Sequence, residues 1–186
     1  NDWSSTLPAG KNSYFYPSVN TSVVVTDAFP SLQGRILSSL KLRAASAKVG
    51  SDAPVYALVP VFLGEANRFG SEPQYRLDPT LANAELKPEI TRSDEIGAEL
   101  FLLDSRVTLD ASLYRKSTRN QIFDVEISGA SGFDRKWINA GEISNKGVEA
   151  LLSVNVFQNP RGFTWTTTLN FAKNRSKVVD LSPGVD

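Results

Sequence analysis

The sequence predicts an all-β fold: an antiparallel meander of about six strands that forms a segment of a transmembrane β-barrel. Its central stretch, residues 86–173, contains four segments in which apolar and polar residues alternate. A period of two is typical of strands that have one apolar and one polar face. The four segments are joined by a short, a long and a short connection. Strands of about ten residues with short turns at one end and long loops at the other are typical of outer-membrane barrels.

The alternation is clearest in the last three of these segments. Their apolar positions are Val107, Leu109, Ala111 and Leu113, then Val148, Ala150, Leu152, Val154 and Val156, then Phe163, Trp165, Leu169 and Phe171. In a barrel these positions face lipid, because lipid offers no hydrogen-bond partner to a polar side chain. Lipid contact is therefore expected for Val107, Leu109, Leu113, Val148, Leu152, Val154, Trp165 and Leu169. Lumen contact is expected for Thr108, Asp110, Ser112, Thr166 and Asn170.

Two tight turns define how these segments pair. Asp104–Arg106 and Gln158–Gly162 are short and polar, so each flanking pair is an antiparallel hairpin. A polar, Gly-rich link, Ser117–Lys146, lies between the two hairpins. Because such barrels keep their short turns periplasmic, we expect this link and the long segment Ser51–Lys87 on the extracellular side.

Two further strands precede the hairpins. Tyr14–Val25 is rich in aromatic and β-branched residues, but it contains Pro17, which predicts an edge, a bulge or a loop base there. Leu40–Val49 alternates again. The first hairpin then begins with the strand Ile90–Leu103, so the expected number of strands is six.

The remaining segments are predicted to be connections. Leu32–Leu40 is compatible with a short helical turn. Ser51–Lys87 has no sustained period and contains four prolines. Its length is unusual for a loop in a compact domain, and Leu58–Leu63 is a candidate strand within it. Asn174–Asp186 is predicted to begin another polar loop.

Composition excludes several classes of function. The formal net charge is zero, which argues against a nucleic-acid partner bound by bulk electrostatics. The absence of Cys excludes a disulfide scaffold, a thiol nucleophile and a thiolate metal site. The absence of His removes the commonest general base and the commonest zinc ligand. Four cations without an acid between them, Arg35, Lys41, Arg43 and Lys48, are interpreted as a solvated or lumen-facing cluster.

Paired carboxylates are the only acid–base chemistry that this composition leaves open. Asp94 with Glu95, and Glu142 with Glu149, are the candidates for a glycosidase pair. The alternative, ordinary solvated carboxylates, is favoured. No catalytic residue, cofactor or metal site is therefore expected, and the protein is not expected to be an enzyme.

Aromatic and basic residues give the remaining candidates. Residues of the long links that could line a sugar or peptide site are Arg68, Phe69, Phe133, Arg135 and Trp137. The favoured alternative is that they hold their loops together. On the last strand, Trp165, Phe163 and Phe171 share one parity. They suit either the core of a soluble sheet or a lipid-facing band with an interfacial aromatic girdle.

Several ordered motifs resemble the barrels of SusC/RagA-like TonB-dependent outer-membrane receptors. The most specific of them is Asn139–Glu149, in which Asn-Ala-Gly-Glu is followed by Ile-Ser-Asn-Lys-Gly-Val-Glu. The others, in the family's order, are Asp2–Ser5 with Tyr14–Ser18, Leu40–Ala44 with Val49–Asp52, Leu86–Glu89 with Glu95–Gly97, Tyr114–Thr118 with Asn120–Ile122, and Trp165 with Asn170–Asn174. The resemblance covers nearly the whole chain.

This resemblance implies a nutrient receptor of the Gram-negative outer membrane. It implies a 22-stranded barrel with a plug, closed on its outer face by a SusD-like lipoprotein lid. It also implies import of glycans or peptides driven by TonB, with outer-membrane lipid around the barrel. The chain has no Met and no signal-peptide pattern. Residues 1–186 are therefore expected to be part of the barrel domain of a longer polypeptide, without its plug and closing strands. The alternative from pattern alone is a soluble β-sandwich that binds carbohydrate.

Overall fold

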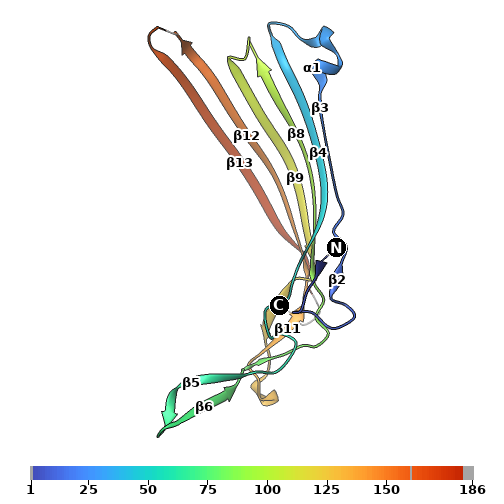
Figure 1. Ribbon diagram of the computed structural model, residues 1–186, viewed down its shortest axis with the longest axis vertical. Helices are drawn as coiled ribbons and strands as arrows, with labels where there is room; N and C mark the ends of the chain where they lie inside the picture. The colour runs from blue at the N-terminus through green and yellow to red at the C-terminus, as the bar shows by residue number, and fades with distance from the viewer. Residues whose placement is uncertain (1, 160, 182–186) are drawn as a thin grey trace.

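A six-stranded antiparallel sheet forms the body of the molecule in the computed structural model, which describes residues 2–159 and 161–181 (Figure 1). The strand order is β13-β12-β9-β8-β4-β3. The strands are β3 (Ser18–Val24), β4 (Leu37–Ser51), β8 (Glu89–Leu102), β9 (Val107–Arg119), β12 (Glu142–Gln158) and β13 (Thr164–Asp180). Strands that follow one another in the sheet also follow one another along the chain, apart from the small elements between them. The predicted antiparallel meander of six strands is confirmed.

Short connections gather at one end of the sheet. The β8–β9 turn is tight: Leu103, Asp104 and Ser105 have positive φ angles, and the Arg106 amide donates to the Leu103 carbonyl at 3.1 Å. The β12–β13 turn follows Gln158, and both predicted hairpins are confirmed; residue 160 of that turn lies outside the described residues. A short helix α1 (Val25–Ala28) and a 3₁₀ turn η1 (Pro30–Leu32) join β3 to β4.

Long connections with secondary structure of their own gather at the other end (Figure 1). Residues 52–88 hold the hairpin β5 (Phe62–Phe69) and β6 (Glu72–Leu77), then β7 (Thr80–Leu81). Residues 120–141 hold β10 (Ile122–Glu126), η2 (Gly129–Ser131) and β11 (Arg135–Asn139). At the same end, β1 (Asp2–Trp3) pairs with β2 (Ser13–Tyr14). No helix among the described residues is long and apolar enough to cross a membrane.

Several predicted boundaries were wrong. The structure continues β13 to Asp180, where the sequence predicted a polar loop from Asn174; the backbone of Asn174–Ser176 pairs with Asn145–Gly147 on β12. Likewise β9 continues to Arg119 and β12 starts at Glu142, so the link expected over Ser117–Lys146 is shorter. At these strand ends the backbone hydrogen bonds between strands continue although the side chains no longer alternate between apolar and polar. The alternation therefore could not predict them.

Three smaller expectations also need correction. The turn expected within Leu32–Leu40 is the 3₁₀ turn Pro30–Leu32, which Pro at its first position favours. The candidate strand Leu58–Leu63 starts only at Phe62. The strand expected over Tyr14–Val25 is divided into β2 and β3 around Pro17, which has no amide hydrogen for a ladder.

The register arranges the apolar residues in rows that cross the sheet. The clearest row joins five leucines on five neighbouring strands: Leu40, Leu100, Leu109, Leu152 and Leu169. The next row toward the long connections is Leu42, Ala98, Ala111, Ala150 and Phe171, and the one after it begins with Ala44, Ile96, Leu113 and Val148. We call the side that bears these rows the apolar face and the opposite side the polar face. The predicted division of alternate residues between two faces is confirmed.

The apolar face is uncovered. Ile96, Leu113 and Leu169 are each more than half exposed, and among the described residues no second sheet lies over them. The aromatic side chains at the short-turn end are exposed as well, and the rings of Phe157 and Trp165 stack with centroids 6.2 Å apart. A β-sandwich requires a second sheet on this face, so the arrangement disfavours the sandwich alternative.

A small core lies instead at the end with the long connections. Leu7, Ala53, Ala57 and Leu86 are almost completely buried there, and four half-buried side chains pack against them: Tyr14, Leu58, Ile122 and Trp137. Burial and the nearby charge of Asp52 raise the pKa of Tyr14 to about 12, so its phenol stays neutral at physiological pH. The core therefore joins the N-terminal hairpin to both long connections.

Candidate functional site

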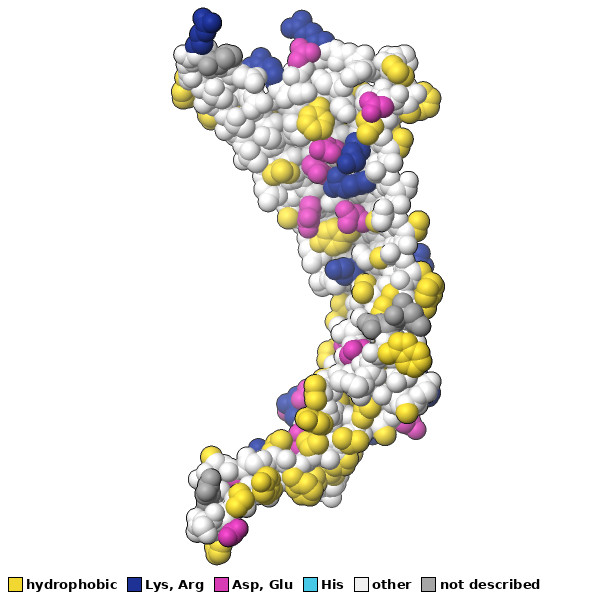
Figure 2. Space-filling view, in the orientation of Figure 1, with side chains coloured by type: hydrophobic (Ala, Val, Ile, Leu, Met, Phe, Trp, Pro, Cys, Tyr) yellow, Lys and Arg dark blue, Asp and Glu magenta, His cyan; other side chains and the backbone are white. Residues whose placement is uncertain are grey.

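The polar face carries a group of charged side chains over its central strands. The Arg43 guanidinium donates from Nη2 to Asp110 Oδ1 at 2.7 Å, and its Nε lies 4.0 Å from Glu95 Oε1. Arg43 is on β4 and Asp110 on β9, so the side chain crosses β8 to reach its partner. Figure 2 shows acidic and basic side chains gathered over the middle of the sheet. Arg43 and its partners are partly exposed, which suits the lining of a water-filled interior.

Glycines provide the space for side chains that cross the polar face. A Cβ atom at Gly97 would lie 2.6 Å from Arg43 Nε, so the guanidinium occupies the place of a side chain on β8. In the same way, a Cβ atom at Gly147 would collide with the ring of Tyr114 on the neighbouring strand. Both glycines belong to the motifs quoted above. They are explained by the close approach of a neighbouring side chain, a use of strand glycines that also fixes register.

The structure separates the carboxylates proposed for glycosidase chemistry. Asp94 and Glu95 are neighbours on β8, so they point to opposite faces. Glu142 and Glu149 also lie on opposite faces of β12, and seven residues of strand, about 23 Å, separate them. Two carboxyl groups must flank one glycosidic bond within about 10 Å. Neither pair meets this requirement.

The aromatic and basic residues of the long connections do not gather into one site. Trp137 packs against the small core, and Arg135 pairs with Asp124 at 2.7 Å within the β10–β11 hairpin. Phe69 lies in the separate β5–β6 hairpin, which projects away from the sheet (Figure 1). The side chain of Arg68 lies outside what the structure describes. Arg135 and Trp137 therefore hold their own segments together, the favoured alternative from the sequence.

The basic cluster inferred from the sequence also divides. Arg35 lies at the short-turn end beside Asp104, 3.5 Å away. Lys41 and Arg43 lie on the polar face, whereas Lys48 shares the parity of the apolar face. Of these four cations, only Lys41 and Arg43 lie on the face where a lumen-facing cluster is expected.

A clamp of hydrogen bonds holds the two long connections together where they leave the sheet. The Asn139 side chain accepts from the Lys87 amide at 2.7 Å and donates to the carbonyls of Lys87 and Asn120 at 2.7 and 2.9 Å. Glu89 adds a contact, because its Oε1 accepts from the Ile122 amide at 2.8 Å. Ala140, next to Asn139, is completely buried and its amide donates to the Gln121 carbonyl at 2.7 Å. The motifs Leu86–Glu89, Asn120–Ile122 and Asn139–Glu149 therefore meet in one junction.

Removing the Asn139 side chain should loosen this junction. In the full-length protein we expect N139A to lower the local opening free energy of residues 120–141 by about 1–3 kcal/mol, because two carbonyls and one amide lose their partner. Hydrogen exchange of the Ile122 and Ala140 amides measures this. N159A, which removes a single turn contact at the opposite end, should leave these amides unchanged. Equal exchange in N139A and the parent protein would contradict the clamp.

Sequence reasoning quoted the clamp residues as motifs but did not predict their contact. Lys87 and Asn139 are 52 residues apart, and the motifs that contain them do not indicate which segments lie side by side. The pairing of Arg43 with Asp110 was also missed, because it depends on the strand order. Parity alone had placed Asp110 on the polar face.

The architecture defines a class of protein: a sheet with one uncovered apolar face, short turns at one end and long connections at the other is a segment of a β-barrel wall. The chain belongs to the TonB dependent receptor-like β-barrel family. The sequence model of that family matches residues 1–183.

The relatives agree with this assignment. The TonB-dependent receptor P26 of Formosa agariphila is 30% identical over 188 residues, which cover 100% of this chain and 19% of that receptor. Among solved structures, a chain of the RagAB peptide transporter is similar with a TM-score of 0.84 at 22% identity, over 98% of this chain and 20% of that one. The siderophore receptor PirA from Pseudomonas aeruginosa has a TM-score of 0.56 at 18% identity, over 88% of this chain and 28% of its own. The chain thus spans about a fifth of the P26 receptor and of the RagAB chain.

Proposed function

We propose that this chain forms part of the barrel wall of an outer-membrane receptor that imports oligomeric nutrients, glycans or peptides, with energy delivered through TonB. The observation that carries the proposal is the uncovered apolar face on a sheet of this family. An exposed face of Leu, Val, Ile and Phe is costly in water but has a natural partner in lipid. The polar face, with its Arg43–Asp110 pair, then faces the interior.

The dimensions of the apolar face support a position in the membrane. From Trp165 to Lys173 the same side of β13 advances by eight residues, about 26 Å along the strand. At the usual barrel tilt of about 40°, this corresponds to about 20 Å along the membrane normal. Trp165 and Phe157 then lie at the interface near the short turns, where barrels place aromatic girdles.

The partners in this proposal follow from the resemblance and the structural likeness. A SusD-like lipoprotein would close the barrel on the side of the long connections, and TonB would act through parts of the receptor beyond this segment. Residues 1–186 are assigned to the barrel domain, with a plug and further strands supplied by the rest of the receptor. The RagAB likeness makes a peptide ligand one of the two candidates.

Cysteine labelling of the intact receptor in outer membranes tests the proposal. A membrane-impermeant maleimide should modify a cysteine at Asp110 on the water-filled side and spare one at Leu109, because lipid shields the apolar face. The two positions are neighbours on β9, so the strand and its depth are matched. Strong modification of L109C with none of D110C would overturn the proposed facing.

A further inference from the structure

Beyond its apolar rows, the same face of the sheet becomes strongly basic. The residues with the parity of the apolar face but nearer the long connections include eight cations: Lys48, Arg92, Arg115, Arg119, Lys146, Lys173, Arg175 and Lys177. Three carboxylates are placed on this face by the same pairings: Asp94, Glu142 and Asp180, which lies opposite Glu142. The charge is thus concentrated on one face and at one end of a chain whose net charge is zero.

Three of these cations lie side by side. Arg115 on β9 pairs with Lys146 on β12, and Lys146 pairs with Arg175 on β13. Like charges placed directly opposite each other on neighbouring strands destabilise a sheet. All three side chains are exposed, and none of the ion pairs formed by the described residues includes them. Such a row is compatible with a stable sheet when an anion binds to it.

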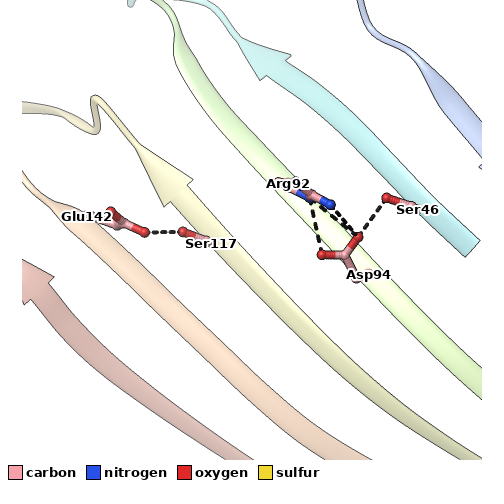
Figure 3. Close-up of polar contacts among 5 residues, drawn as sticks. All are labelled: Ser46, Arg92, Asp94, Ser117 and Glu142. Carbon is pink, nitrogen blue, oxygen red and sulfur yellow. Dashed lines mark hydrogen bonds and ion pairs between the residues drawn. The ribbon is translucent and has the colours of Figure 1, made fainter.

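Asp94 and Glu142 each hold an arginine within this basic region. Asp94 Oδ2 lies 3.2 Å from Arg92 Nε and Asp94 Oδ1 accepts from the Ser46 hydroxyl at 2.6 Å; Figure 3 shows these contacts. Glu142 pairs with Arg119 at 3.1 Å and accepts from the Ser117 hydroxyl. Asp94 also lies opposite Arg115 across the β8–β9 pair, so one carboxylate accompanies the three cations of the row. The row keeps a net positive charge, which an anion from outside the chain can neutralise.

A shallow groove of about 610 Å³ lies within this region. Its lining comprises Lys48, Ile90, Arg92, Asp94, Arg115, Ser117, Arg119 and Glu142. Four cations and two carboxylates leave it positive, and the Ser117 hydroxyl and the Ile90 side chain complete a surface suited to a headgroup with an attached acyl chain. The groove is continuous with the apolar rows, because Arg115 follows Leu113 and Asp94 precedes Ile96 on the same face.

We infer that this basic region binds the phosphate groups of lipid A in the outer leaflet of the membrane. The inference rests on the proposed function, which places the apolar rows in lipid and the long connections outside the cell. The row Arg115–Lys146–Arg175 then lies one row beyond Ile96, Leu113 and Val148, at headgroup depth on the extracellular side. Charge complementarity selects the occupant: an anionic phosphate anchored by acyl chains matches a cationic row directly beside an apolar band.

The test measures lipid binding to the purified full-length receptor in detergent. Native mass spectrometry compares bisphosphorylated lipid A with the same lipid lacking its phosphates. The variant R115Q/K146Q/R175Q should bind bisphosphorylated lipid A about a hundredfold more weakly, since each cation near a charged lipid surface contributes about one factor of five. Added salt should weaken binding to the parent receptor but not to the variant.

Matched controls separate a local site from general charge effects. Lys116 follows Arg115 on β9 but points to the polar face, so K116Q should change binding less than twofold. An equal loss in K116Q, an unchanged triple variant, or equal binding of the dephosphorylated lipid would overturn the inference. Equal retention of phosphatidylglycerol would also overturn it, because that result assigns the row to any anionic lipid.

A separate experiment tests the topology on which the proposed function depends. An epitope tag near Gly132 should be reached by antibody on intact cells, and one near Asn159 should not. Access only at Asn159 would invert the topology and remove the outer leaflet from contact with the basic row. The expected tag result combined with unchanged lipid A binding would overturn the inference alone.

Discussion

Leu152→Arg should strongly impair assembly of the intact receptor in the membrane. Leu152 belongs to the row of five leucines, and its partner Leu169 lies four residues from Trp165 and four from Lys173. The row is therefore midway across the proposed apolar band. An arginine on the lipid side of a barrel costs about 2–4 kcal/mol at the midplane. We expect urea unfolding of the receptor in lipid vesicles to show a loss of this size and less folded protein in cells.

The adjacent residue provides the control. Ser153 lies on the polar face, with its hydroxyl 3.4 Å from that of Thr168, so S153R places the same charge in the water-filled interior. Its cost should stay below about 1 kcal/mol, as for most exposed substitutions. Equal losses for L152R and S153R would show that the two faces are not distinguished by lipid.

Gly147→Ala should have the second large effect. The ring of Tyr114 occupies the space that a Cβ atom at position 147 needs. The ring must move, and overpacking of this kind costs about 1–3 kcal/mol. The same unfolding experiment on the full-length receptor measures it. G129A is the control, because nothing lies within 4 Å of a Cβ atom at Gly129.

A double-mutant cycle identifies the cause of the loss at position 147. Y114A removes the ring, so G147A should cost much less in that background than in the parent receptor. The coupling should recover at least half of the single-variant loss. Additive losses would mean that Gly147 is needed for backbone reasons and that the contact with Tyr114 has little part in it.

The faces of the sheet were predictable because each depends only on neighbouring residues. Val107, Leu109 and Leu113 alternate with Thr108, Asp110 and Ser112, and no tertiary information is needed to place them on opposite sides. The same reasoning failed at Asn174, where β13 continues with polar residues on both faces. Backbone hydrogen bonds with Asn145–Gly147 hold that part of the strand. Such pairing cannot be predicted from the alternation of apolar and polar side chains.

The long connections show a similar limit. The sequence indicated that Ser51–Lys87 was unusually long and contained a short strand, but not that Leu86 is completely buried beside Leu7 and Ala57. Prolines and irregular polarity predict a connection, but they do not indicate which residues it packs against. For Arg135 and Trp137 the contacts agree with the favoured alternative, in which they hold their own hairpin and core together.

The sequence by itself determined the all-β class, the two hairpins, the parity of each strand and the family motifs, since these depend on periodicity, turn chemistry and residue identity over short stretches. Only the tertiary structure decided that Asn139 contacts Lys87, that Arg43 reaches Asp110 across Gly97, and that Arg115, Lys146 and Arg175 share one row. Each of these contacts joins different strands or connections. It therefore depends on strand order and register, which backbone hydrogen bonds set across the sheet.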